Sequence, residues 1–336
     1  MTPSKVSIIV PVYNAGKHFT QCLDSLVNQT LREIEIILVL DLPADGSDRV
    51  AEQYAQRDSR IKLIYNEINL HIGKSRNRGM EQATGKYIGF VDHDDYCQLE
   101  MFEWMYQKAE GEHSDIVCCN YIKEQNGTQQ YPQSEYIPSS ENRENFIRAI
   151  LRAETGGEGC LWNKLFRNNF LKQNQIQFID TKLSSGEDYL FVLNVFFCTS
   201  KISYLPQNLY HWVTHTHNTG NTDNYHTIEK NIINRLNIFA AVNENKPDNA
   251  YYFDFLTGTG QYIYSPFFRA LKERNFADAL HIVATIKNSE IYCHIKNIFK
   301  REYLSVLLQW KPTIGIFFII LRIIPQKRRK HEELRN

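Results

Sequence analysis

The sequence predicts an α/β protein with a mainly parallel central sheet, followed by a helical C-terminal region. Through roughly the first 120 residues, continuous apolar runs alternate with segments whose apolar residues recur at helical spacing. Such runs are typical of strands buried on both faces. A strand that returns after a crossover helix pairs in parallel with the strand before it. From residue 141 onward, helical spacing dominates.

The predicted strands and helices alternate in the first part of the chain. Strands are expected at Val6–Val12, Ile34–Leu40, Ile61–Tyr65, Lys86–Val91 and Ile116–Cys119. Helices are expected at 19–27, from a cap at Ser47 or Asp48 to Arg57, at 73–83, and from about 98 to 109. The polar stretch 121–140, with Gln125-Asn126-Gly127, predicts a hairpin or loop.

The composition indicates a folded protein without a broad basic surface. Of the 336 residues, 43% are hydrophobic and 23% are charged, which allows a core and excludes a mainly disordered chain. Lys plus Arg (38) equals Asp plus Glu (38), so the formal net charge is zero with His neutral. We therefore expect no nucleic-acid partner bound through a general basic field.

The cysteines and the first residues indicate a cytoplasmic protein. The seven Cys include no CxxC pair, and Cys118 adjoins Cys119 in an apolar run. This pattern suits neither a zinc site nor a disulfide framework, so we expect reduced thiols. The N-terminal apolar run is short, is interrupted by Pro11 and lacks a small-residue cleavage site. We expect no signal peptide there.

The helical part begins after a polar stretch near residues 222–228. This soft boundary predicts a first domain over 1–222, a helical region over 223–311 and a tail over 312–336.

The tail combines an apolar run with a basic cluster. Pro312 can open a helix, Ile314–Ile324 is almost entirely apolar, and residues 327–330 are basic. The run is shorter than the ~20 apolar residues that span a bilayer. It favours a helix that lies at an anionic membrane surface. The alternative is a terminal helix that packs on its own domain.

Three carboxylates follow the strand that ends at Val91, in the run Asp92-His93-Asp94-Asp95. In parallel α/β sheets, ligands bind beyond the carboxyl ends of the strands. Carboxylates this close repel one another unless a cation offsets their charge, and hard oxygen ligands suit Mg²⁺ or Mn²⁺. The alternative is an acidic turn that caps the next helix near Gln98, which explains one Asp well and three poorly.

Two further segments carry groups that suit a nucleotide. Asp41 follows the second strand and can accept hydrogen bonds from a base or ribose, whereas turn and cap chemistry explains Asp45 to Asp48. Lys74 and Arg76 stand near a helix start, where basic side chains and backbone N–H groups can hold a diphosphate. The alternative for these two is a solvated basic helix face.

A carboxylate pair, Glu187-Asp188, precedes the apolar helix Tyr189–Phe197. Acidic residues at a helix start are stabilised as anions, so capping is one reading and a general base is the other. The signatures of dinucleotide dehydrogenases, P-loop NTPases, α/β-hydrolases and zincins are missing from the sequence.

The motifs, taken in order, resemble those of the family 2 glycosyltransferases, which are inverting enzymes with the GT-A nucleotide-sugar fold. The segments are VSIIVPVYN, EIILVLD with its DGSD loop, NLHIGKSRNRG, GKYIGFVDHDD and GEDYLF. Together they cover roughly residues 4–215.

The resemblance implies roles for residues at the strand ends. Pro11, Tyr13 and Asp41 would line the nucleotide base pocket, and Arg76 would lie near the diphosphate. Asp92-His93-Asp94 matches the family's Asp-x-Asp motif. In that motif Asp94 is the main ligand of Mn²⁺ or Mg²⁺, and Asp92 reaches the ribose or the metal shell.

The resemblance also implies the catalytic base. Asp188 matches it, with Glu187 beside it, and Trp162-Asn163-Lys164 resembles a segment near the donor sugar or acceptor. One departure concerns the second strand, where many members carry two adjacent aspartates and this chain has Leu40-Asp41.

These roles imply an inverting hexosyltransferase that uses a nucleotide-sugar, expected to be a UDP-sugar, and a divalent metal. The acceptor would be a hydroxyl of a saccharide, expected to be a lipid-linked oligosaccharide in capsular or surface polysaccharide synthesis. The protein would lie on the cytoplasmic face of the bacterial inner membrane. The alternative is a non-catalytic protein of the same fold that binds a nucleotide-sugar or serves as a scaffold.

Overall fold

The computed structural model describes residues 4–132, 137–152, 159–182, 186–214, 228–245 and 250–289, together with Tyr292. The chain divides into two compact units. The first consists of Met1–Ile150 and Thr155–Thr222, and the second of Leu151–Glu154 and Asp223–Asn336. The tail over 312–336, for which the sequence predicts a surface helix, lies outside the described residues.

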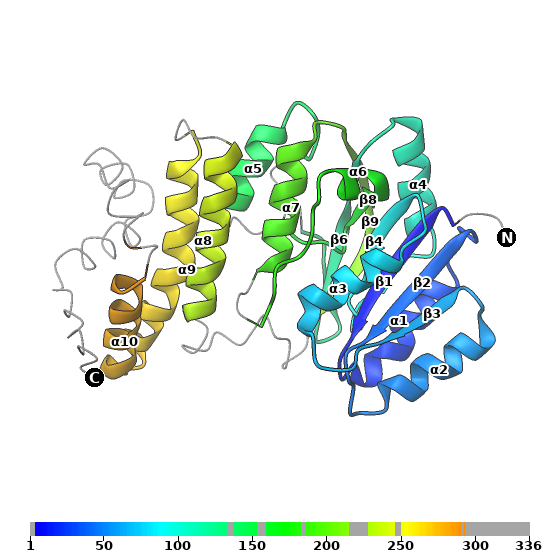
Figure 1. The fold of residues 1–336 in the computed structure, drawn as a ribbon, viewed down its shortest axis with the longest axis horizontal. Helices are drawn as coiled ribbons and strands as arrows, with labels where there is room; N and C mark the ends of the chain where they lie inside the picture. Colours follow the sequence, from blue (N-terminus) through cyan, green and yellow to red (C-terminus); the bar gives the residue numbers. More distant parts are fainter. Residues whose placement is uncertain are drawn as a thin grey trace, which may run out of the picture. The chain divides into compact units, whose positions relative to one another are not determined.

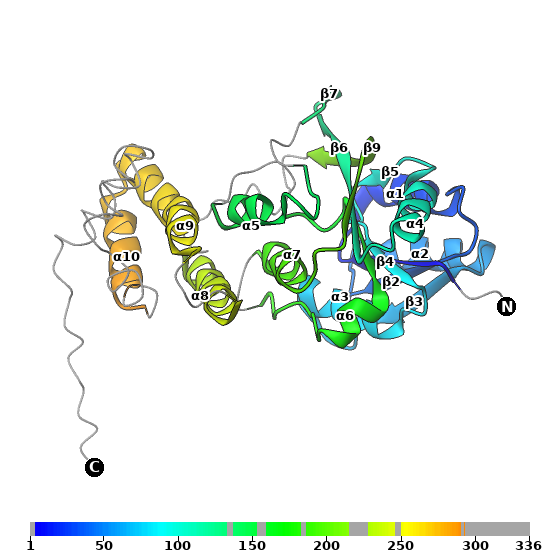
Figure 2. The same cartoon turned by 90° about the horizontal axis from the view of Figure 1, so that it is seen from above.

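The first unit is built on a sheet of nine strands among its described residues, in the order β3-β2-β1-β4-β8-β6-β9-β5 with β7 beside β6 (Figures 1 and 2). Its first four strands are parallel, as predicted: β1 (Val6–Val12), β2 (Ile34–Leu40), β3 (Ile61–Tyr65) and β4 (Tyr87–Phe90). Every residue of β1, β2 and β4 is buried, which explains why these strands are mainly apolar.

Beyond β4 the sheet is mixed. Strand β8 (Lys164–Arg167) runs antiparallel between β4 and β6 (Ile116–Gln125), and β9 (Ile202–Thr214) runs parallel to β6 with a bulge near Asn120. Strand β5 (Tyr96–Cys97) pairs with β9. Strand β7 (Thr128–Gln130) forms a hairpin with β6, which is one of the two structures predicted there. Strands β8 and β9 fall where the sequence predicts mainly helices.

The helices cover both faces of the sheet (Figure 2). On one face lie α1 (Phe19–Val27), α2 (Ser47–Arg57) and α4 (Met101–Gly111), whose apolar residues join Ile8 and Val10 in one core. On the other face lie α3 (His71–Gln82) and α7 (Glu187–Cys198). There Phe191 packs edge-on against Phe90. A Cβ at Gly79 of α3 would come within 2.5 Å of Ile9, so glycine permits this close approach.

Several helix starts differ from the prediction: α3 begins at His71 rather than residue 73, and α7 at Glu187 rather than Tyr189. The sequence predicts a cap at Ser47 or Asp48, but the N-cap of α2 is Gly46, and Asp45 Oδ1 accepts the Ser47 N–H at 3.1 Å. Gly46 has φ +90°, a conformation that glycine adopts without strain. Helix α4 begins at Met101 rather than near residue 98. The remaining helices are η1 (Gly16–His18), α6 (Asn168–Gln173) and α5 (Arg143–Arg152), and the last two residues of α5 belong to the second unit.

The second unit is helical in its described residues, which confirms the predicted helical region. It contains α8 (Ile228–Asn245), α9 (Tyr252–Lys272) and α10 (Phe276–Lys287). Buried Arg235 donates to Thr259 Oγ1 and to the Phe255 carbonyl, both at 3.0 Å. Among the described helices, none is both long and apolar enough to cross a bilayer.

Candidate functional site

The carboxyl ends of β1, β2 and β4 meet at one edge of the sheet because these strands are parallel. Pro11 lies in β1, is buried, and is in register with Val39 of β2. Tyr13 follows β1 and is 50% exposed, while Asp41 follows β2 and is 3% exposed. The residues that the resemblance assigns to a base pocket therefore share one edge of the sheet.

Asp41 is held in place by the segment after β3. Its Oδ1 accepts hydrogen bonds from Asn66 Nδ2 at 2.7 Å and from the Leu70 N–H at 2.8 Å. Asn66 Nδ2 also donates to Ser75 Oγ of α3 at 3.0 Å. The other carboxylate oxygen of Asp41, Oδ2, accepts no hydrogen bond from the described residues. Asp41 thus has one fixed oxygen and one that can accept from a ligand.

The loops after β1 and β2 are tied to each other. Ala15 N–H donates to Ser47 Oγ at 3.0 Å, and Gly16 N–H donates to Asp45 Oδ2 at 2.9 Å. Ala44 N–H donates to Asn14 Oδ1 at 2.7 Å. Although partial burial opposes it, hydrogen bonds from Ser47 and Gly16 lower the pKa of the Asp45 carboxyl. The interpretation of Asp45 as a turn residue is confirmed.

Arg76 of α3 brings three predicted site residues together. Its Nη1 donates to Glu187 Oε1 at 2.9 Å and to Asp188 Oδ1 at 2.5 Å, and its Nη2 donates to Asp92 Oδ1 at 3.0 Å. The guanidinium also lies over the Phe178 ring, at 5.4 Å from the centroid. Arg76 is 1% exposed, so the alternative of a solvated basic helix face is wrong for this residue.

Arg76, Asp92, Glu187 and Asp188 shift one another's pKa values. Burial raises the pKa of Asp188 well above its usual range, Glu187 and Asp92 raise it further, and Arg76 opposes them. Burial alone would lower the pKa of Arg76, but Asp188, Asp92 and Glu187 raise it above its ordinary value. A carboxyl whose pKa is raised in this way is a stronger base than an ordinary aspartate once it is ionised.

The turn after β4 is fixed by β9. The Asp92 N–H donates to Tyr210 Oη at 3.2 Å, and the Tyr210 hydroxyl donates to Asp95 Oδ2 at 2.7 Å. Asp95 is 2% exposed, and burial together with Asp92 and Asp94 raises its pKa. No helix starts at the turn, and α4 has no side-chain cap, so the capping alternative is wrong. Tyr210 is a site residue that the sequence reasoning missed.

The remaining carboxylates of this turn suit a divalent metal. Asp92 and Asp94 are half-buried oxygen donors that follow a strand end, and their charges add to that of Asp95. Among the described residues, no three His, Cys, Asp or Glu side chains form a metal-binding group. Mg²⁺ is commonly bound by one or two carboxylates, while substrate phosphates and water complete its coordination shell. The donor set therefore fits an ion that arrives with a diphosphate.

Trp162 lies in an aromatic cluster that includes Tyr210, the residue hydrogen-bonded to the turn. Its ring stacks on Tyr210 with centroids 4.6 Å apart, and Tyr121 meets it edge-on at 4.8 Å. It is 5% exposed. The structure thus places Trp162 next to the residue that holds Asp92.

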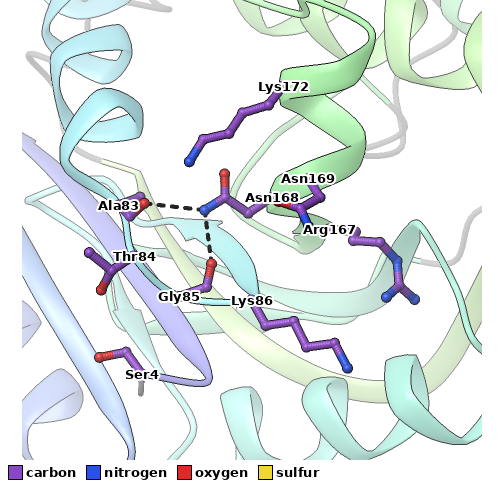
Figure 3. Close-up of a pocket in the computed structure, with 9 residues that line it drawn as sticks. All are labelled: Ser4, Ala83, Thr84, Gly85, Lys86, Arg167, Asn168, Asn169 and Lys172. Atoms are coloured by element: carbon purple, nitrogen blue, oxygen red, sulfur yellow. Dashed lines mark hydrogen bonds between the residues drawn. The ribbon is translucent and has the colours of Figure 1, made fainter. Parts of the chain in front are cut away.

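Two other basic groups lie apart from the carboxylate cluster. Lys74 pairs with Asp180 at 2.5 Å on the surface. A pocket of about 460 Å³, lined by Ser4, residues 83–86, 167–169 and Lys172, lies near the amino ends of β1 and β4, opposite the ligand edge (Figure 3). Of its three cations, Lys86 pairs with Glu110 and Arg167 with Asp115, and Lys172 is the third. This pocket contains none of the predicted site residues.

Comparison with known proteins decides the family. The model of glycosyl transferase family 2 matches residues 7–174, which is half of the chain. The chain belongs to glycosyltransferase family 2. It is 38% identical over 210 residues to the uncharacterized glycosyltransferase EpsJ of Bacillus subtilis (strain 168), covering 61% of this chain. The chain spans 62% and 60% of the length of the first two curated relatives that it matches.

Solved structures of other glycosyltransferases share the fold. A structure of S. aureus TarS 1-349 in complex with UDP aligns with a TM-score of 0.69 and 22% identity over 93% of this chain and 88% of that chain. The mannosyltransferase PcManGT from Pyrobaculum calidifontis, in complex with GDP-Man and Mn2+, aligns with a TM-score of 0.53 and 13% identity, over 96% and 88% of the two chains. The predicted GT-A fold of this family 2 member is confirmed.

Proposed function

We propose that this family 2 glycosyltransferase is an inverting, metal-dependent enzyme that moves a hexose-type sugar from a UDP-sugar to a saccharide hydroxyl. The observation that carries the proposal is the pair of contacts made by Arg76. Its guanidinium donates both to Asp92 of the Asp-x-Asp motif and to Asp188, which lies 112 residues later in the chain. A structural neighbour, TarS, was solved with UDP and with UDP-GlcNAc. That neighbour supports a uridine nucleotide.

The donor would bind along the edge of the sheet where the carboxyl ends of β1, β2 and β4 meet. Exposed Tyr13 and buried Pro11 would contact the base, and the Oδ2 of Asp41 would accept a hydrogen bond from it. Asp92, whose side chain is 29% exposed, would reach the ribose or the metal shell. Glu187 and Trp162 would border the donor sugar.

The metal would be Mn²⁺ or Mg²⁺, held by Asp94 and Asp92. Mn2+ is present in the PcManGT complex. When bound, such an ion would neutralise the charge that develops on the departing diphosphate. The positive charge of Arg76 would also stabilise the departing diphosphate. Its ion pairs with Asp92 and Asp188 hold the two carboxylates at a fixed distance from each other.

Asp188 would act as the general base. It would take the proton from the acceptor hydroxyl as that oxygen attacks the anomeric carbon on the face opposite the nucleotide. The bond to the nucleotide breaks as the new bond forms, so an α-linked donor would give a β-glycoside. Arg76 holds Asp188 by one oxygen, Oδ1. The ionised carboxylate would receive the proton at its other oxygen.

The acceptor and location are proposed on the sequence. The apolar run and basic cluster over 312–336 support peripheral contact with the cytoplasmic face of the bacterial inner membrane, where a lipid-linked oligosaccharide would be presented. We propose that residues 1–222 form the catalytic domain and that 223–311 form a separate helical region.

Thermal unfolding with UDP, GDP, CMP and ADP, each with and without Mn²⁺, tests the nucleotide. A ligand at about 100 times its dissociation constant adds ~2.7 kcal/mol, which raises Tm by a few degrees. We expect UDP to raise Tm only when Mn²⁺ is present. In a separate assay with a saccharide acceptor, we expect the sugar of a UDP-sugar to be transferred to the acceptor and UDP to be released. A rise in Tm with GDP rather than UDP would indicate a GDP-sugar donor in place of a UDP-sugar. No response to any nucleotide, with no transfer, would contradict the proposal and favour a scaffold.

Asp94→Ala is expected to raise the Mn²⁺ concentration needed for UDP binding by about tenfold or more, because it removes the main oxygen ligand. The measurement is the UDP-dependent rise in Tm as Mn²⁺ is titrated. Glu103→Ala in α4 is the matched control, since it removes the same charge from a half-buried position outside the site. Equal Mn²⁺ requirements in the two variants would remove Asp94 from the metal shell.

A further inference from the structure

Both ends of the Asp92–Asp95 turn are tied to one strand. The Asp92 N–H donates to Tyr210 Oη, and the Tyr210 hydroxyl donates to Asp95 Oδ2. The Val213 N–H donates to Asp95 Oδ1 at 2.7 Å, and the Asp95 N–H closes the turn on the Asp92 carbonyl at 3.1 Å. The Tyr210 hydroxyl therefore joins the first residue of the turn to the last.

Asp95 is a buried side chain that both the Tyr210 hydroxyl and the Val213 N–H hold in place. Asp95 is 2% exposed and lies beside two other carboxylates, and no Lys or Arg in the described part of the chain forms an ion pair with it. A buried carboxyl group is costly to desolvate, so its two oxygens need hydrogen-bond partners. What the arrangement does supply is direction, since each Asp95 oxygen accepts one hydrogen bond from β9.

The ring of Tyr210 is itself fixed. Tyr210 is fully buried, and Trp162 stacks on it with an angle of 14° between the rings. Tyr121 of β6 meets Trp162 from the edge, so two strands and the Trp162 segment support the hydroxyl. A rotation of Tyr210 would require this cluster to repack, so its Oη stays under the Asp92 amide.

We propose that Tyr210 and Asp95 are positioning residues that hold the Asp92–Asp95 turn in the conformation that binds the metal and the donor nucleotide. Trp162 acts through Tyr210. We call Tyr210 and Asp95 together the brace. The inference rests on the proposed function and deepens it. The brace acts on the backbone of the turn, so it sets the direction of the Asp92 and Asp94 carboxylates without touching the ion. Partners that orient metal ligands from behind commonly change metal affinity by 10–100-fold when they are removed.

Tyr210→Phe tests the brace, because it deletes the hydroxyl and keeps the ring that stacks on Trp162. Tyr204→Phe is the matched control: it lies in the same strand, and its hydroxyl donates to Asn120 Oδ1 at 2.7 Å. We titrate Mn²⁺ at saturating UDP and follow the rise in Tm relative to each variant's own ligand-free Tm. The half-saturating Mn²⁺ concentration is expected to rise about tenfold in Tyr210→Phe and to stay within twofold in Tyr204→Phe.

A metal-free measurement separates positioning from general loss of stability. Hydrogen exchange of the peptide that carries the Asp92 amide is expected to be faster in Tyr210→Phe than in Tyr204→Phe. Asp95→Asn, which keeps one acceptor oxygen, is the second variant and is expected to raise the Mn²⁺ requirement less. Equal Mn²⁺ requirements for Tyr210→Phe and wild type would overturn the brace. If wild type binds no nucleotide with Mn²⁺, the proposed function fails instead.

Discussion

Asp188→Asn is expected to lower the rate of sugar transfer by about 10²–10⁴-fold while the affinity for UDP and Mn²⁺ stays within about twofold. The amide cannot take the proton of the acceptor hydroxyl. Its oxygen can still accept the hydrogen bond from Arg76 Nη1, so the cluster keeps its geometry. The substitution therefore separates catalysis from donor binding.

The measurement pairs a transfer assay with the UDP-dependent rise in Tm. Asp180→Asn is the control, since Asp180 forms a surface pair with Lys74 and its loss is expected to change the rate by less than about twofold. Near-normal turnover of Asp188→Asn would exclude Asp188 as the base. Loss of UDP binding in the same variant would instead indicate that Asp188 supports the donor site through Arg76.

Arg76→Met is expected to reduce the free energy of unfolding by about 3–5 kcal/mol at neutral pH, since it leaves three carboxylates together without their cation. Methionine keeps most of the buried aliphatic volume, so the deficit reports charge more than packing. Urea unfolding measures it. Lys86→Met is the control, because its pair with Glu110 is largely exposed and is worth about 0–1 kcal/mol.

The deficit of Arg76→Met should depend on pH with a defined sign. Burial already raises the pKa of Asp188, and Arg76 opposes the rise, so removal of Arg76 raises that pKa further. A native state that binds more protons than the unfolded chain loses stability as the pH increases. The deficit should be largest near pH 8 and smallest near pH 5. A deficit that is constant over this range would show that packing alone is lost.

Local pattern predicted the first half of the fold well. Strands β1, β2 and β3 lie at the predicted residues, because each is a mainly apolar segment bounded by turn residues. Strand β9 escaped prediction because Pro206 and polar Gln207-Asn208 interrupt it, and because its pairing partner β6 lies more than 80 residues earlier. Alternation within one segment carries no information about such a partner.

The site was predicted as residue types but not as a geometry. The motif order indicated Asp92, Glu187 and Asp188 as acidic site residues. That one buried Arg76 joins all three depends on α3 and α7 packing on the same face of the sheet, which no local pattern encodes. Tyr210 was missed for the same reason, since one tyrosine in an aromatic-rich strand gives no signal.

The hydrogen bonds between the loops after β1 and β2 constrain how donor preference can change. Asn14, Ala15 and Gly16 in one loop are bonded to Ala44, Ser47 and Asp45 in the other. A change in the length of either loop would break bonds that hold its neighbour. Under the proposed assignment of Tyr13 and Asp41 to the base pocket, exchange of these loops between relatives should succeed only when both are transplanted as a pair. Chimeras with a single exchanged loop should lose nucleotide affinity, whichever relative supplies the loop.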